Sequence, residues 1–129
     1  MGELPTPKIE PATAEDVFSA AHTLGDILAK TPQYIAFLDT LQVVNHDPQI
    51  QQISAKIRHL RSQMQYFQHT PEQAQEMEKL ENELESLPVV QAYRKMEADL
   101  HQLMVQVDQS LGQIIGMPFA ANAKRSCCG

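Results

Sequence analysis

Two cysteines stand side by side near the end of the sequence, in the stretch KRSCCG. Cys127 and Cys128 are the only cysteines of the chain, and they follow the last periodic apolar segment. We therefore expect their thiols to be exposed and not packed in a core. Thiolates bind zinc, copper(I) and the iron of iron–sulfur clusters, and the neighbouring Lys124 and Arg125 favour the thiolate anion. The pair is the strongest candidate metal site in the sequence.

Two thiolates are too few ligands for a complete metal site. A tetrahedral zinc or an iron–sulfur cluster ordinarily takes four protein ligands, so Cys127 and Cys128 would have to share a site with a second copy or a different subunit. A disulfide between adjacent cysteines closes a strained ring, and a reducing compartment disfavours it. A shared metal site and an inert tail are the two alternatives that the residues leave open.

No other residue pattern predicts catalysis. The sequence contains no glycine-rich phosphate loop, nucleophile elbow or HExxH helix. No two of its histidines have the four-residue spacing of a metal-binding helix face, and we interpret them as surface, cap or packing residues: His22, His46, His59, His69 and His101. The sequence therefore predicts a protein that is not an enzyme.

The charge and hydropathy patterns exclude two classes of partner. The formal net charge is −6, and the only basic stretch, KIRHLR, is interpreted as a solvated or salt-bridged helix face. Direct nucleic-acid binding is not expected, because it requires clustered lysine and arginine side chains. No apolar run approaches the roughly 18 residues that span a membrane. We predict a cytoplasmic protein without membrane contact.

Prolines mark the starts of the helices that must position these residues. Four of them stand just before periodic apolar segments: Pro32, Pro48, Pro71 and Pro88. Thr31, Asp47 and Thr70 precede the first three as suitable N-caps, whereas Leu87 does not. Thr13 and Asp16 predict a capping box at the start of an earlier helix. The expected helices cover approximately residues 13–30, 32–44, 48–67, 71–87 and 88–115.

Two of these helices carry matching apolar seams. The steps of three and four residues along the third helix run through Ile50, Ile53, Ile57, Leu60, Met64 and Phe67. The fourth helix continues the pattern at Met77, Leu80, Leu84 and Leu87. The pattern predicts an antiparallel hairpin. Its charges are complementary, since residues 71–85 contain six glutamates against one lysine and the preceding helix is basic.

The last helix has the longest apolar stripe, from Val89 to Ile114, and Gly116 and Pro118 end it. Such a stripe needs another surface to cover it. We predict a homodimer, or a heterodimer with a related chain, that uses helical faces. The predicted partner-binding residues are Tyr93, Met96, Leu100, Leu103 and Val107.

The predicted fold is an all-α bundle of about five helices, built on the hairpin of the third and fourth helices with the long C-terminal helix against it. Residues 1–12 are expected to form a flexible N-terminal segment, residues 13–116 the helical bundle, and residues 117–129 a flexible tail that contains the cysteines.

Residues 13–129 resemble the YlbF/YmcA family of small helical bacterial regulators. The resemblance is carried by the terminal cysteines and by three stretches: AHTLGDILAKTPQYIAFLDT, HDPQIQQI, and PEQAQEMEKLENELESLPVVQAYRKMEADLHQLMVQVDQSLGQII. The chain departs from the family pattern in having only an adjacent cysteine pair, and cysteine-free relatives such as the YheA branch show that the fold does not require a cluster.

The resemblance implies a noncatalytic adaptor that regulates competence, biofilm formation and sporulation. It implies a complex with a sister family member and a YaaT-type subunit, linked to ribonuclease Y-dependent RNA maturation and holding iron–sulfur clusters, with Cys127 and Cys128 as ligands. Zinc is the alternative metal, and an isolated chain that binds neither is equally consistent with the sequence. The alternative function is a thiol-dependent metal carrier or zinc-binding helical protein.

Overall fold

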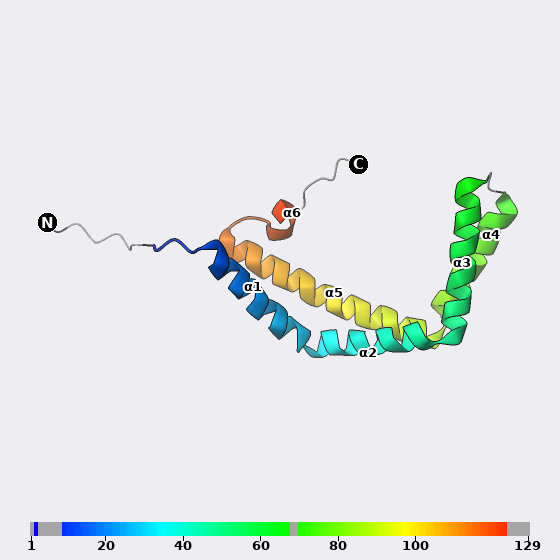
Figure 1. Ribbon diagram of the computed structural model, residues 1–129, viewed down its shortest axis with the longest axis horizontal. Helices are drawn as coiled ribbons and strands as arrows, with labels where there is room; N and C mark the ends of the chain where they lie inside the picture. Colours follow the sequence, from blue (N-terminus) through cyan, green and yellow to red (C-terminus); the bar gives the residue numbers. More distant parts are fainter. Residues whose placement is uncertain (1, 3–8, 68–69, 124–129) are drawn as a thin grey trace. The chain divides into compact units, whose positions relative to one another are not determined.

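The computed structural model describes residue 2 and residues 9–67 and 70–123. This part of the chain is all-helical, as predicted (Figure 1). Its helices are α1 (Ala14–Ala29), α2 (Pro32–His46), α3 (Pro48–Tyr66), α4 (Pro71–Ser86), α5 (Pro88–Ile115) and α6 (Phe119–Ala123). The chain divides into two units, Met1–Thr31 and Pro32–Gly129, so that α1 belongs to the first and the other five helices to the second.

The first unit contains α1, which begins with the predicted capping box. The backbone N–H of Asp16 donates to the Thr13 hydroxyl at 3.1 Å, and the Thr13 backbone N–H donates to the Asp16 carboxylate at 2.9 Å. The hydrogen bond from the Thr13 backbone lowers the pKa of Asp16. Together these bonds satisfy two donors that a helix start otherwise leaves unpaired.

Helix starts in the second unit also follow the sequence signals. The Asp47 carboxylate accepts from the Ile50 backbone N–H at 3.0 Å, and Thr70 forms a reciprocal capping box with Gln73. Leu87 supplies no side-chain cap, as its type predicts. Thr31, the last residue of the first unit, donates its hydroxyl to the Leu28 carbonyl oxygen at 2.7 Å, which is a contact at the end of α1 and not at the start of α2. The contacts of Asp47 and Thr70 explain why α3 and α4 start at Pro48 and Pro71.

Helices α3 and α4 pack against each other as the predicted hairpin, and they lie side by side in Figure 1. Ile53, Ile57 and Leu80 form its buried core, and the partly buried residues around them are Leu60, Met77, Leu84 and Leu87. The row of apolar residues on α3 that the spacing predicts to be buried ends before Phe67. Phe67 lies just after α3 and its side chain is 71% exposed, because the extended backbone there turns it out of the helical register.

The long helix α5 packs mainly along α2, which corrects the expectation that it lies against the hairpin (Figure 1). It contacts α4 less extensively, next to the break at Leu87 and Pro88. The rings of Phe37 on α2 and Tyr93 on α5 have their centroids 5.5 Å apart. An apolar stripe identifies the face that a helix buries, but it does not identify the element that covers this face.

Helix α5 ends where the sequence predicts, at Gly116. Gly116 has a φ of 74°, a left-handed conformation that glycine adopts without a Cβ penalty. The backbone N–H groups of Gly116 and Met117 both donate to the Gly112 carbonyl oxygen, at 2.9 and 3.1 Å. Residues 119–123 of the predicted tail form α6, where the Ala120 N–H donates to the Asp108 carboxylate at 3.0 Å.

Candidate interaction surface

The predicted partner-binding residues form one row along α5. Their spacing of three and four residues places them on the same side of the helix. All of them are half-buried: Tyr93, Met96, Leu100, Leu103 and Val107. We call this row the α5 seam. Although α2 packs along α5, none of the seam residues is fully covered.

Exposed apolar side chains lie on α5, which carries the seam, and on α2, which packs along it. On α2, Ile35 is 49% exposed and Val43 is 54% exposed. On α5, Met104 and Val105 are exposed, and Ile114, which the sequence places at the end of the stripe, is 80% exposed. An exposed apolar surface of this extent on two packed helices is typical of a protein–protein interaction site.

Tyr93 links the seam to the start of α5. Its ring contacts Phe37 of α2, and the Arg94 guanidinium lies 5.7 Å from the Tyr93 ring centroid. Burial and the neighbouring Glu97 carboxylate raise the pKa of Tyr93. The first residue of the α5 seam is therefore held by an aromatic contact to Phe37 and a cation–π contact to Arg94.

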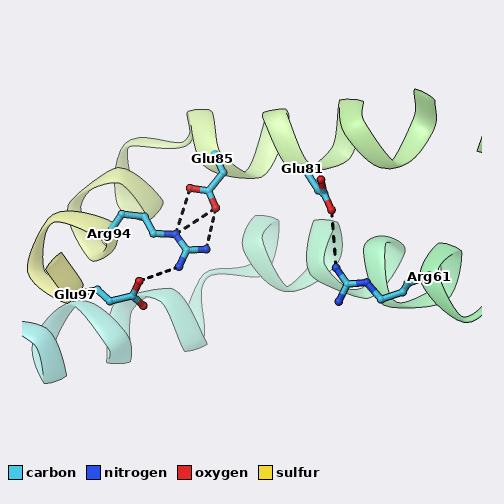
Figure 2. Close-up of polar contacts among 5 residues, drawn as sticks. All are labelled: Arg61, Glu81, Glu85, Arg94 and Glu97. Atoms are coloured by element: carbon cyan, nitrogen blue, oxygen red, sulfur yellow. Dashed lines mark hydrogen bonds and ion pairs between the residues drawn. The ribbon is translucent and has the colours of Figure 1, made fainter. Parts of the chain in front are cut away.

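Arg94 joins α5 to α4 through a forked contact (Figure 2). Its Nη2 and Nε donate to the Glu85 carboxylate, with a shortest distance of 2.8 Å, and its Nη1 donates to Glu97 at 3.2 Å. The hydrogen bond to Glu85 is the main cause that raises the pKa of Arg94. A bidentate contact fixes the relative orientation of the guanidinium and the carboxylate, so it helps to fix the orientation of the first turns of α5 relative to the end of α4.

Arg94 and the buried Val90, which is 4% exposed, were not among the residues predicted from the sequence. The spacing of Arg94 and Glu97 at i and i+3 on one helix is a pattern that predicts an ion pair. The pairing of Arg94 with Glu85 could not be predicted from spacing, because the two residues lie on different helices, on either side of the break between α4 and α5.

We expect Arg94→Ala to destabilise the junction of α4 and α5 by about 1 kcal/mol. The side chains of Arg94 and Glu85 are both half-exposed, so solvent screening limits the contribution of a contact that would be stronger if buried. Urea unfolding at low and high salt measures the effect, which should shrink as salt rises. Lys95→Ala removes a neighbouring positive charge and is the matched control. An equal loss in both variants would contradict the assignment.

Cys127 and Cys128 lie outside the described residues, so their role as metal ligands stays a prediction. Within residues 9–67 and 70–123, no three histidine, cysteine, aspartate or glutamate side chains are grouped so that they could hold a metal ion. In the same part of the chain, no helix has the length and apolar character needed to cross a membrane.

The helical fold and the half-covered seam define a class of small all-α proteins with exposed helical surfaces. The chain belongs to the YlbF/YmcA family, because residues 17–115 match the family model described as "Control of competence regulator ComK, YlbF/YmcA". This match confirms, over residues 17–115, the resemblance to the family that residues 13–129 indicate.

A solved structure has the same fold. It is the crystal structure of Bacillus subtilis RicA in complex with RicF, and the match has a TM-score of 0.72 at 14% sequence identity. The match covers 81% of this chain and 96% of the matched chain. At this identity the likeness shows the fold alone. The comparison with curated proteins gives no match.

Proposed function

We propose that this protein is a noncatalytic regulatory adaptor that binds a sister member of the YlbF/YmcA family through the α5 seam. The observation that carries the proposal is the half-covered state of the seam along its whole length, from Tyr93 to Val107. A row of apolar side chains with this spacing fits the apolar face of another helix. Family membership supports a regulatory role connected with the competence regulator ComK.

The likeness to the RicA structure supports a protein partner. RicA is there in complex with RicF, a second protein, and it has the fold of the present chain. In our proposal the complex also contains a YaaT-type subunit, and it influences ribonuclease Y-dependent RNA maturation, competence, biofilm formation and sporulation. With a net charge of −6, the adaptor acts on RNA indirectly, through its protein partners.

In this proposal Cys127 and Cys128 contribute to an iron–sulfur cluster that the subunits share, with zinc as the alternative occupant. A cluster so held would supply a redox-sensitive link between subunits, and the chain's own contribution is two thiolate ligands. The rival proposal is a thiol-dependent metal carrier or zinc-binding helical protein. It makes metal binding the primary function and subunit assembly secondary.

Leu100→Asp tests the adaptor proposal, because it places an unpaired charge in the middle of the α5 seam. We expect it to reduce binding of a co-expressed sister subunit by at least about 100-fold, in line with the cost of burying an unpaired charge in an interface. Co-purification and isothermal titration calorimetry with each family member from the same genome measure this loss.

Ala98→Asp is the matched control, since Ala98 is an exposed residue of α5 and lies about 160° around the helix from Leu100. Circular dichroism separates loss of binding from loss of fold. The proposal is wrong if Leu100→Asp keeps wild-type helix content and still binds the sister subunit as tightly as Ala98→Asp does.

A further inference from the structure

A groove runs along one face of the α3–α4 hairpin. One section, of about 490 Å³, is lined by Met64 and Met77 together with Gln65, Arg61 and Glu81. The next section, of about 300 Å³, is lined by Ile57, Leu84, Arg61, Glu81, Glu85 and Arg94. Arg61 and Glu81 line both sections, so the two sections adjoin at this pair of side chains. The groove has an apolar floor and charged edges.

The two edges of the groove carry opposite charges. Arg61 belongs to the α3 edge, and the exposed Arg58 lies three residues earlier, on the same side of the helix. Glu81 and Glu85 belong to the α4 edge, four residues apart. The groove therefore has one basic edge and one acidic edge, with methionine and aliphatic side chains between them (Figure 2 shows Arg61, Glu81 and Glu85).

The contact within the chain leaves most of this charge accessible. Arg61 and Glu81 approach only to 3.9 Å, and their side chains are 68% and 52% exposed. An exposed ion pair at this distance contributes little to stability. Glu85 differs, because Arg94 holds it in a close forked contact. Arg61 and Glu81 are thus the charges that a docking partner can use.

We propose that this groove docks the same groove of a second copy of the chain. With a two-fold axis along the hairpin, α3 of each copy lies on α4 of the other, and Arg61 of one copy faces Glu81 of the other. Every basic edge then meets an acidic edge, and the apolar floors close over each other as a four-helix arrangement. The unbranched Met64 and Met77 side chains adapt to such a contact.

The arrangement of charges selects a second copy as the occupant. A lone acidic helix would match only the Arg61 edge, and a lone basic helix would match only the Glu81 edge. A second hairpin in the same order matches both edges at once. None of the five α5 seam residues lines the groove, so this interface goes beyond the proposed binding of a sister subunit.

Two charge reversals test the proposal by sedimentation equilibrium on the full chain. Each reversal made alone, Arg61→Glu or Glu81→Arg, places two like charges opposite each other at both of the symmetry-related contacts of the dimer. Each should therefore raise the dimer dissociation constant at least about tenfold. An equimolar mixture of the two variants should restore it to within about threefold of wild type, because both contacts are then between opposite charges. If the reversals acted only by breaking the Arg61–Glu81 ion pair within each chain, mixing the two variants would not restore the dimer.

Lys56→Glu and Glu72→Arg are the control reversals, because they lie about 140° and 180° around α3 and α4 from Arg61 and Glu81. Both should leave the dimer unchanged. A wild-type chain that stays monomeric at about 200 µM overturns the proposal, and so does a mixture that fails to associate. If a reversal unfolds the chain, Arg61→Gln and Glu81→Gln replace it, and the dimer must then weaken with each. Binding of the sister subunit by the same variants reports separately on the α5 seam.

Discussion

Leu80→Ala is expected to lower the free energy of unfolding by about 3 kcal/mol, within the range for removing a large buried aliphatic side chain. Leu80 is 7% exposed and belongs to the hairpin core with Ile53 and Ile57. The core contains few other buried side chains that can move into the space, so a cavity remains. A loss of this size is a large fraction of the stability of a small domain. Urea unfolding monitored by circular dichroism measures it.

Asn82→Ala is the control, since Asn82 is an exposed residue of the same helix. It should change the free energy of unfolding by no more than about 0.5 kcal/mol. If the two alanine variants unfold at the same urea concentration, α4 does not depend on the packing of Leu80 against α3.

Replacing both Cys127 and Cys128 by serine is expected to abolish the iron–sulfur absorption of the complex reconstituted with its sister subunit under anaerobic conditions. Serine hydroxyls do not replace thiolates as ligands of soft metals. Absorption spectra with iron, zinc and sulfide analysis distinguish a cluster from a zinc site. The isolated wild-type chain should load only weakly, because two thiolates leave the coordination incomplete.

Deletion of residues 124–129 should give the same loss of metal. Helix content and thermal stability should stay at wild-type values, because the last described helix ends at Ala123. Retention of a full cluster by either variant complex would show that the ligands come from elsewhere. Capture of the sister subunit without metal supports the adaptor, whereas loss of capture together with the metal favours the metal carrier.

Local signals in the sequence predicted several elements of the fold correctly. The helix starts at Pro48, Pro71 and Pro88 are set by proline geometry and by caps only a few residues away. Gly116 ends α5 for an equally local reason, its left-handed backbone. The two partners of each such contact are only a few residues apart in the chain, so the contact can be predicted from a short stretch of sequence.

The face of α5 that carries the candidate site was predicted in the same way, while partner binding by its residues stays a prediction. The spacing of Tyr93, Leu100 and Val107 identified one face of α5, and the structure has all three half-buried on that face. The cysteine pair was equally visible, but it lies outside the described residues. Family membership followed from patterns of length and apolar spacing, which the match over residues 17–115 confirms.

The sequence by itself determined which residues form helices, which face of each is apolar, and that α3 and α4 pair across a short turn. Only the tertiary structure decided that α5 packs along α2, that Arg94 joins Glu85, and that the groove beside Arg61 and Glu81 stays open. The physical reason is that helix ends depend on contacts within about four residues. The choice of covering element depends on competition among all apolar faces of the chain, and periodicity does not rank these faces.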